Sequence, residues 1–290
     1  MSKYVKIDLH LHTDCSDGTD TPEELLAKVR AAGIELFAVT DHDTIKCTGI
    51  MPGLLGKDGP DYINGIEFSC KEWVGGIEEK YHILGYGFDP ENEEINAVIR
   101  KGRSLRMQKA EKRLEFLEKE YGFTFSREDL DAFFSMNSPA KPHLARMMVR
   151  YRYARDVDDA VENYIDNMKE EFHLIPQEAI RGILAAGGIP VLAHPPYGDG
   201  KGDFSGKVLE DRVVKLVGYG IEGLEGYYHK YSDARRAEVL GLAEKYGLYV
   251  TAGSDYHGKT KTVPIGLTHL PDASAWPEGL RRFLKDVRKI

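Results

Sequence analysis

Histidine and carboxylate side chains occur along this chain in short motifs whose spacing suits a metal site. His10 and His12 alternate within an extended apolar run, so both imidazoles project to one side of a predicted strand and could share an ion. Asp255 and His257 repeat this spacing near the C-terminus. A single pair could equally be two neutral side chains bonded to polar neighbours. The recurrence of the pattern favours a metal centre.

Three more motifs place metal-type ligands at the ends of other predicted strands. They are Thr40-Asp41-His42-Asp43, Gly65-Ile66-Glu67 and Ala193-His194-Pro195. Without cations, these groups would repel one another at a common site and lose hydration at a large cost. A mixed set of imidazoles and carboxylates suits manganese, iron or zinc better than calcium or copper. The residues do not choose among those three metals.

The elements that must position these motifs alternate between short apolar runs and helical stretches. Strands are predicted over residues 4–12, 36–41, 62–69, 81–88, 189–194, 221–227, 249–254 and 266–269. Helices are predicted over residues 22–32, 177–186, 207–217 and 232–246, ending at Gly33, Gly187, Gly218 and Gly247. Thr21 and Glu24 form a capping box at the first of them. This order predicts an α/β fold, a (β/α) barrel with its site at the carboxyl ends of the strands.

Residues 91–175 interrupt this alternation of strands and helices with long polar helical stretches. We expect residues 1–90 and 176–290 to form the barrel and residues 91–175 to form a helical insertion that contributes to the substrate site. Within it, residues 96–155 hold 14 Lys and Arg against 7 Asp and Glu, although the whole chain carries a net charge of −8. Basic residues are therefore in excess in only one segment of an acidic protein. Because an extended nucleic-acid surface needs basic residues along its whole length, this distribution argues against one.

Composition excludes several other classes of protein. The chain has 290 residues, of which 42% are hydrophobic and 30% charged, as in an ordinary globular protein. No apolar run approaches the roughly 20 residues of a membrane span, and three cysteines are too few for a disulfide framework. We expect a cytoplasmic protein with no membrane contact and no obligate protein partner. A Gly-x-Ser-x-Gly elbow is absent, so a serine hydrolase has no support.

Taken together, the motifs resemble the polymerase and histidinol phosphatase (PHP) family of metal-dependent phosphoesterases. The matching segments run in the family's order: His10-x-His12, Ser16-Asp17-Gly18, Thr40-Asp41-His42-Asp43, Gly65-Ile66-Glu67, His82, Ala193-His194-Pro195 and Asp255-x-His257. The resemblance implies a distorted (β/α)7 barrel, so one of the eight predicted strands would be a hairpin or edge piece. It also implies a cluster of two or three divalent ions, usually manganese, iron or zinc.

The resemblance assigns the ligands in three groups. His10, His12, Glu67 and Asp255 would hold one ion, and Glu67 would bridge to a second ion held by His82 and His194. Asp17, His42 and His257 would hold a third, and Glu67, Asp255 and His194 are also the candidate catalytic residues. His82 departs from the pattern because it lies near the start of its predicted strand. Asp41 and Asp43 are expected to orient His42.

The expected reaction is hydrolysis of small phosphate mono- or diesters by a hydroxide that bridges two ions. Candidate substrates are a nucleotide, a nucleoside bisphosphate or a cyclic sugar phosphate. The alternatives are a 5′-3′ exonuclease on short RNA and a histidinol-phosphate-type phosphatase. A metal-dependent amidohydrolase would normally have a bridging lysine on a mid-barrel strand, and none is evident among the predicted strands. A noncatalytic metal-stabilised scaffold would not require the whole ligand set, which is present here.

The insertion supplies candidate phosphate-binding residues. Arg103 and Arg106 resemble the arginine pair that begins the inserted helix in related phosphoesterases. The segment from Lys141 to Arg146 resembles an R-P-H-x-A-R motif and includes His143, with a lysine point charge where the family has an arginine fork. His229 follows a strand and could also reach the substrate. For Lys109 and Arg113, a solvated helix face is the simpler interpretation, and His173 and His269 are interpreted as structural.

Overall fold

Seven strands follow one another around a single sheet in the computed structural model, which describes residues 3–56, 59–136, 138–168, 172–198 and 202–290. The strands are β1 (Ile7–Leu11), β2 (Leu36–Val39), β3 (Asp61–Val74), β4 (Ile77–Tyr86), β5 (Ile189–Leu192), β6 (Gly223–Tyr228) and β7 (Tyr249–Gly253). Beyond its end, β7 returns to β1, because Asp255 N donates to His10 O at 2.8 Å and His12 N donates to Tyr256 O at 2.9 Å. The predicted distorted (β/α)7 barrel is confirmed as a nearly closed barrel.

All neighbouring strands are parallel except β4, which runs antiparallel to both β3 and β5. The reversal comes from a tight hairpin between β3 and β4. Gly75 and Gly76 both have positive φ, +58° and +85°, as a two-residue type I′ turn requires. Side chains at these two positions would be strained, so the glycine pair fixes the turn and with it the register of the two strands.

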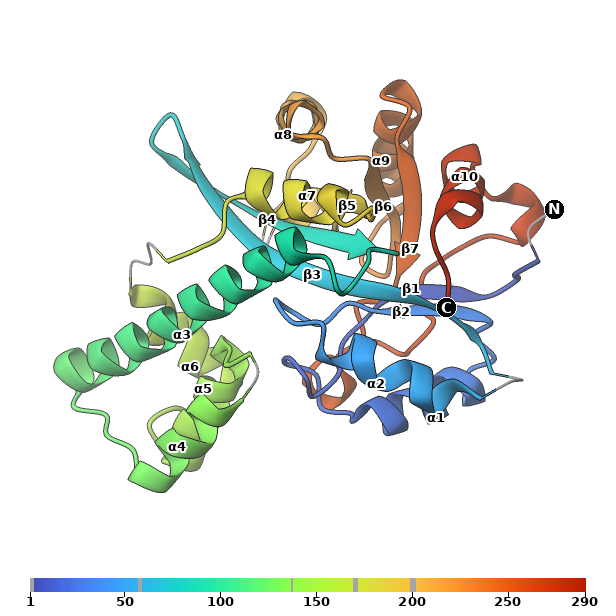
Figure 1. Ribbon diagram of the computed structural model, residues 1–290. Helices are drawn as coiled ribbons and strands as arrows, with labels where there is room; N and C mark the ends of the chain where they lie inside the picture. The colour runs from blue at the N-terminus through green and yellow to red at the C-terminus, as the bar shows by residue number, and fades with distance from the viewer. Residues whose placement is uncertain (1–2, 57–58, 137, 169–171, 199–201) are drawn as a thin grey trace.

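Helices cover the barrel on the outside (Figure 1). Helices α7 (Pro176–Ala185), α8 (Gly206–Tyr219), α9 (Asp233–Lys245) and α10 (Glu278–Asp286) lie on one side of the strands, and α1 (Pro22–Ala31) and α2 (Lys46–Leu55) lie on the other. The capping box of α1 forms as predicted, because Thr21 Oγ1 accepts from Glu24 N and Glu24 Oε2 accepts from Thr21 N. The side chains of Leu25 and Val29 face the core and are fully buried.

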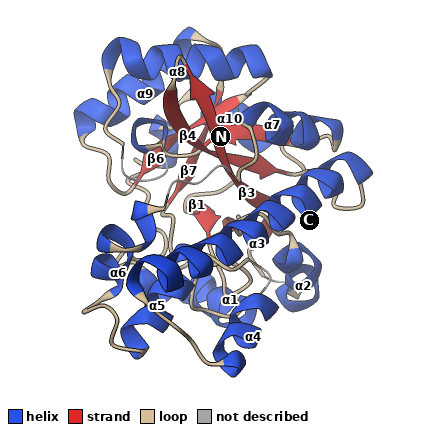
Figure 2. Ribbon diagram, turned by 90° about the vertical axis from the view of Figure 1, so that its left-hand side faces the viewer, coloured by secondary structure: helices blue, strands red, loops and turns tan. Residues whose placement is uncertain are grey.

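Where it is described, the segment between β4 and α7 forms the α-helices α3 (Glu93–Tyr121), α4 (Arg127–Ser135), α5 (Lys141–Arg150) and α6 (Val157–Asn163), followed by a single 3₁₀ turn over Ile165–Asn167. They have a hydrophobic cluster of their own, which includes Leu117, Phe133, Leu144 and Met148. Figure 2 shows α3, α5 and α6 in front of the strands on one side of the barrel. The insertion therefore lies against one side of the barrel, where its side chains can contribute to a site at that side.

Three details of the predicted elements are wrong or incomplete. Residues 266–269 do not form a strand, because Gly266 N donates to the buried carboxylate of Asp8 at 2.8 Å instead of to a neighbouring strand. Helix α8 continues through Gly218 and ends at Gly220. Helices α2 and α10 were not predicted; α2 contains Pro52, yet it forms because its apolar side chains pack on the barrel.

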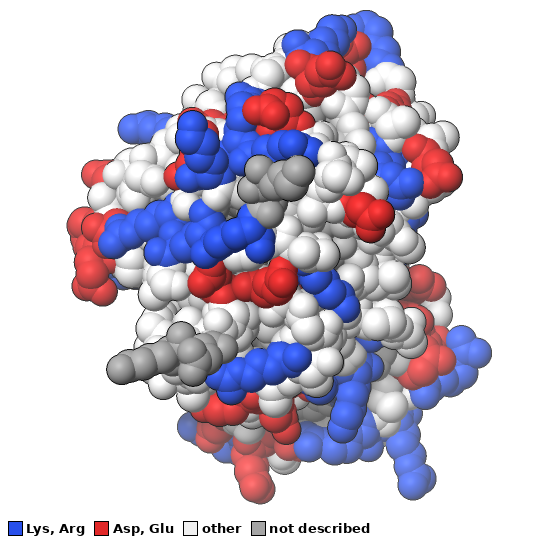
Figure 3. Space-filling model, turned by 90° about the vertical axis from the view of Figure 1, so that its right-hand side faces the viewer, with Lys and Arg blue, Asp and Glu red and all other residues white. Residues whose placement is uncertain are grey.

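Charged side chains are distributed unevenly over the molecule. On the face that carries both termini, acidic and basic side chains are interspersed (Figure 3). Within the described ranges, no helix is long and apolar enough to cross a membrane.

Candidate active site

The structure brings all nine predicted ligands together at one end of the barrel, and we refer to these side chains as the metal centre. They are His10, His12, Asp17, His42, Glu67, His82, His194, Asp255 and His257. All are buried except His82, whose side chain is 17% exposed. Three overlapping sets of donor atoms lie within 4.8 Å of one another: His12, Asp17, His42 and His257; His10, His12 and Glu67; and His42, Glu67 and His82.

Glu67 divides its two carboxylate oxygens between different imidazoles. Oε2 lies 3.3 Å from His10 Nε2 and 3.2 Å from His12 Nε2. Asp255 Oδ1 lies 3.5 and 3.4 Å from the same two nitrogens. His10, His12, Glu67 and Asp255 thus lie together, and that they share one ion, as the family resemblance implies, stays a prediction.

The other oxygen, Glu67 Oε1, lies 2.9 Å from His82 Nδ1 and 3.5 Å from His194 Nε2. His82 reaches this position because β4 is antiparallel, and its opposite neighbour on β3 is Ser69. His82 is the sixth residue of β4, which begins at Ile77 and not at residue 81 as predicted. Because β4 is reversed, this point of the strand lies beside the carboxyl ends of the parallel strands.

Asp17 lies near a separate set of imidazoles. Its Oδ1 is 3.3 Å from His257 Nε2, and its Oδ2 is 3.9 Å from His42 Nε2. The loop that carries Asp17 lies close to the end of β1, because Gly18 N donates to Thr13 O. A Cβ atom at Gly18 would lie 2.7 Å from His12 O, so only glycine permits this approach.

The electrostatics of the centre fit cation binding. Burial alone would raise the pKa of Glu67, but the imidazoles of His42, His10 and His82 lower it well below its usual range. Burial would likewise raise the pKa of Asp17, yet His257 and His42 hold that pKa well below its usual range. Both carboxylates therefore remain anionic inside the protein, as metal ligands must.

Unsatisfied polar atoms make the same point. Among the described residues, the ring nitrogens of His12, Oε1 of Glu67 and Nδ1 of His194 make no hydrogen bond of good geometry, although His12 Nε2 and Glu67 Oε1 lie within ion-pair distance of neighbouring ligands. Buried polar atoms without partners are rare in folded proteins and call for a bound group. Cations at this place would satisfy the atoms that face the centre, and the mixed imidazole and carboxylate set fits manganese, iron or zinc.

Glu225 of β6 is a buried residue that sequence reasoning missed. Its Oε1 lies 2.9 Å from His10 Nδ1, and its Oε2 accepts from His194 N at 2.8 Å. Burial alone would lower the pKa of His10, but the carboxylates of Glu225, Glu67 and Asp255 raise it well above its usual value. The available signal was an acidic residue inside an otherwise uncharged strand, Gly223–Tyr228.

Asp255 is held by two further residues. Lys261 Nζ lies 2.6 Å from its Oδ2, and Tyr228 donates its hydroxyl hydrogen to the same oxygen at 3.0 Å. Since these contacts occupy Oδ2, the other oxygen, Oδ1, is directed to His10 and His12. Lys261 lies six residues beyond Asp255, and no motif marked it.

Asp41 and Asp43 do not orient His42 by a hydrogen bond, so that prediction is wrong. Asp41 accepts from Thr13 N, Thr13 Oγ1 and Ser16 Oγ, and so fixes the loop that carries Asp17. Asp43 instead accepts from Arg106 of α3 and from Ser69 N. Each carboxylate is taken by donors from a neighbouring element, which the local motif could not reveal.

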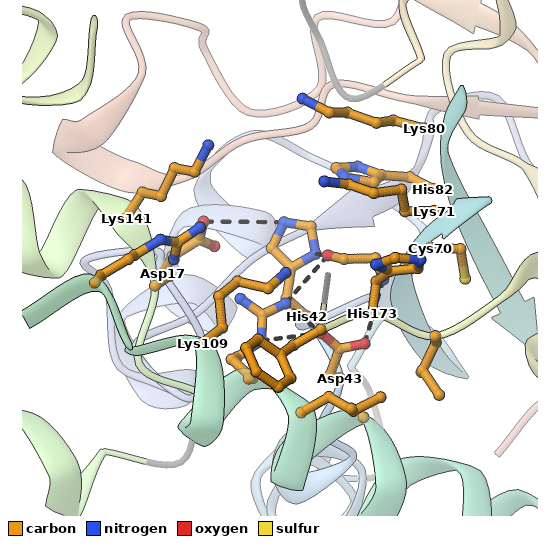
Figure 4. Close-up of a pocket in the computed structure, with 18 of the residues that line it drawn as sticks. Asp17, His42, Asp43, Cys70, Lys71, Lys80, His82, Lys109, Lys141 and His173 are labelled. Carbon is orange, nitrogen blue, oxygen red and sulfur yellow. Dashed lines mark hydrogen bonds and ion pairs between the residues drawn. The ribbon is translucent and has the colours of Figure 1, made fainter. Parts of the chain in front are cut away.

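A cavity of about 760 Å³ extends from the metal centre towards the insertion, and we call it the cavity throughout. Asp17, His42 and His82 lie on its lining, together with six cationic residues: Lys71, Lys80, Arg106, Lys109, Arg113 and Lys141. Figure 4 shows Lys71 and Lys80 on one side of it and Lys109 and Lys141 on the other. The lining also holds four carboxylates, of which Asp43, Glu78 and Asp166 pair with basic residues of the same wall, so basic side chains outnumber acidic ones beside the metal centre.

Arg103 and Arg106, the predicted arginine pair of the insertion, lie in different environments. Arg106 lines the cavity, where its Nε donates to Asp43 at 3.0 Å and its guanidinium also contacts Ser69. Arg103 is exposed and is not among the lining residues. Lys109 and Arg113, interpreted from the sequence as a solvated face, line the cavity instead. The usable signal was the spacing along α3, three residues from Arg106 to Lys109 and four from Lys109 to Arg113, which places all three on one side of the helix.

The remaining candidates lie at different distances from the cavity. Lys141 lines it and pairs with Asp166, whereas His143 accepts from Ala140 N and caps α5. Burial lowers the pKa of His143 to about 4 and that of His229 to about 4, so both imidazoles are neutral at pH 7. His173, interpreted as structural, is also part of the lining.

Backbone strain is concentrated at the same end of the barrel. Asp43, His194 and Asp255 have positive φ angles of +52°, +29° and +55°, a region that non-glycine residues rarely adopt. Such strain persists where surrounding contacts over-determine the conformation, which happens often at active sites. Here it aims three polar side chains at the metal centre or the cavity wall.

Comparison with known proteins agrees with this geometry. A solved structure from Chromobacterium violaceum, described as an amidohydrolase with bound sulfate and no metal, has a TM-score of 0.82 at 26% identity and covers 98% of this chain and 97% of its own. A protein from Bifidobacterium adolescentis, assigned as a metal-dependent phosphoesterase, has a TM-score of 0.80 at 25% identity over 97% and 96%.

Curated relatives cover similar lengths. A 5′-3′ exoribonuclease of Haemophilus influenzae is 29% identical over 90% of this chain and 93% of its own length. A 3′,5′-nucleoside bisphosphate phosphatase of Chromobacterium violaceum is 27% identical over 87% of each. A phosphoribosyl 1,2-cyclic phosphate 1,2-diphosphodiesterase of Eggerthella lenta is 29% identical over 89% and 96%.

Fold, ligand set and relatives together define a metal-dependent phosphoesterase, a hydrolase of phosphate esters. The PHP domain matches residues 8–174, more than half of the chain. The chain belongs to the PHP domain family.

Proposed function

We propose that this protein hydrolyses small phosphate esters, with the metal centre holding two or three divalent ions of manganese, iron or zinc. The observation that carries the proposal is the convergence of nine donor residues, eight of them buried and His82 partly buried, at the end of a cavity lined by basic residues. When bound, such ions lower the pKa of water and stabilise charge on phosphoryl oxygens. The substrate would be a nucleotide, a nucleoside bisphosphate or a cyclic sugar phosphate, as the names of two relatives suggest.

Residues of the chain would prepare this chemistry. Glu67 shares its two oxygens between two sets of imidazoles, and Asp255 turns one oxygen to the centre while Lys261 and Tyr228 hold the other. His194, fixed through its backbone N–H by Glu225, completes the set of candidate catalytic residues. Asp255 and His194 are thus oriented by contacts with residues outside the metal centre, and such support raises metal affinity.

The insertion, residues 91–175, would form the substrate-binding part of the site. Arg106, Lys109, Arg113 and Lys141 come from α3 and α5 and face the cavity. The positive charge of Arg106, Arg113 and Lys141, joined by that of Lys109 when a bound anion raises its pKa, would neutralise a phosphate and direct it to the metal centre. His143 and His229 would contribute only at the edge of the site, because neither is among the lining residues.

A 5′-3′ exonuclease on short RNA is the second candidate, because three of the curated relatives are named 5′-3′ exoribonucleases. The excess of basic residues is confined to residues 96–155, with 14 Lys and Arg against 7 Asp and Glu, which supports a short substrate over a long one. An amidohydrolase is disfavoured, since Lys71 and Lys80, the lysines of the described strands, pair with Glu78 and not with Glu67. The three free, buried cysteines support a reducing compartment such as the cytoplasm.

Metal analysis and one histidine variant test the proposal. Protein purified without chelator should contain at least about two equivalents of manganese, iron or zinc. His10→Ala should lose metal and hydrolysis of p-nitrophenyl phosphate while it stays folded. His269→Ala, an exposed histidine outside the metal centre, is the matched control and should keep both. Less than one equivalent after reconstitution, or unchanged turnover in His10→Ala, would contradict the proposal.

A further inference from the structure

The hairpin of β3 and β4 presents a graded series of side chains along one face. Residues two apart on a strand share a face, and residues directly opposed across an antiparallel pair share it as well. On the face that carries Glu67, the successive opposed pairs are Ser69 with His82, Lys71 with Lys80, and Trp73 with Glu78. All six of these side chains line the cavity.

The chemistry of these pairs changes with distance from the metal centre. The first pair contains a metal-type ligand, the second contains two cations, and the third contains an indole. A strand rises about 3.3 Å per residue, so the pair containing Trp73 lies about 13 Å along the hairpin from the pair containing His82. A ligand that used the whole face would have a phosphate at one end and an aromatic group at the other.

Trp73 has no packing role that would explain its position. Its side chain is 58% exposed, whereas Trp276, the other tryptophan of the chain, is 3% exposed and belongs to the core. Glu78, opposite Trp73, is directed to the lysines, at 2.8 Å from Lys71 and 3.5 Å from Lys80. An exposed indole at the rim of a cationic cavity is typical of a platform on which a base stacks.

We propose that Trp73 is a specificity-determining residue that stacks on the base of a nucleotide whose scissile phosphate lies at the metal centre. The inference rests on the proposed phosphoesterase function and narrows its substrate class. A sugar phosphate without a base leaves the indole unused. Stacking does not distinguish one base from another, so the preference is for nucleotides as a class.

Two substrates that share a sugar phosphate test the proposal. Trp73→Ala should raise KM for adenosine 5′-monophosphate about 5- to 150-fold, the range reported for loss of one stacked base. It should change KM for ribose 5-phosphate less than about twofold, and Trp73→Phe should keep most of the affinity. Ile77→Ala is the matched control, because Ile77 is 70% exposed on the same hairpin and does not line the cavity. Equal changes for both substrates, or none, would overturn the proposal.

Fluorescence separates failure of stacking from failure of hydrolysis. Metal-loaded protein is titrated with an adenosine 5′-phosphonate, whose C–P bond is not hydrolysed, and with ribose 5-phosphate. The phosphonate should quench emission of the wild type but not of Trp73→Phe, whose remaining indole is the buried Trp276, and ribose 5-phosphate should quench neither. Absence of quenching by the phosphonate at millimolar concentration would overturn the proposal even if the enzyme hydrolyses phosphate esters.

Discussion

Replacing Glu225 with glutamine should weaken metal binding although Glu225 itself lies outside the metal centre. Glu225 is fully buried, and its two oxygens accept from different donors, His10 Nδ1–H and His194 N–H. A glutamine has one oxygen, so one of these donors would face the NH₂ group. If the oxygen stays with His194, the amide donates to His10 Nδ1, which moves the ring proton to Nε2 and blocks the nitrogen that faces Glu67.

The expected loss in metal affinity is 10- to 100-fold, about 1.4–2.7 kcal/mol, as for other carboxylates that support a metal-bound histidine. A competition titration of Mn²⁺ against a fluorescent chelator measures it, and denaturant unfolding of the metal-free protein measures the stability change separately. Glu222→Gln is the matched control, because Glu222 lies just before the same strand and is only partly buried. Manganese affinity within twofold of the wild type would refute the orientation argument.

Two further outcomes follow from the cavity wall. Arg106→Ala should raise KM for a phosphate substrate about tenfold while metal content stays the same, because Arg106 lines the cavity. Arg103→Ala is the control and should change KM less than twofold, because Arg103 is exposed and does not line it. Equal effects of the two variants in steady-state kinetics would contradict this prediction. Burial, with Arg113 and Arg106 nearby, lowers the pKa of Lys109 to about 6, so Lys109 is uncharged above that pH until an anion binds. Binding of inorganic phosphate as an inhibitor should therefore take up a proton and tighten as pH falls from 8 to 6. The pH dependence of its inhibition constant should be shallower in Lys109→Met, and identical profiles would refute the assignment.

The types of residue in the metal centre could be predicted from the sequence because their chemistry is local. Alternate spacing in a strand places His10 and His12 on one side whatever the rest of the fold does. The capping box at Thr21 and the barrel rhythm likewise depend on short-range preferences. The structure brings together the predicted ligands from distant parts of the chain, and the role of each in holding a particular ion remains a prediction.

The supporting contacts could not be predicted because they join residues far apart in the chain. Glu225 meets His10 across 215 positions, and Arg106 meets Asp43 across 63. The direction of β4 decides that His82 lies beside Glu67; the Gly75-Gly76 pair is a local hairpin signal for that reversal, but the sequence prediction did not use it. The helical periodicity of α3 could be predicted from the sequence. Which side of α3 faces the cavity could not, because it depends on how the insertion packs against the barrel.

The amino-acid sequence by itself determined which side chains this protein offers to cations, since imidazole and carboxylate chemistry and strand periodicity are properties of short segments. Only the tertiary structure decided which groups hold those ligands in place. It also decided which basic side chains line the cavity and that Trp73 lies at its rim. Those choices follow from strand pairing and helix packing, which depend on the free energy of the whole chain and not on any one motif.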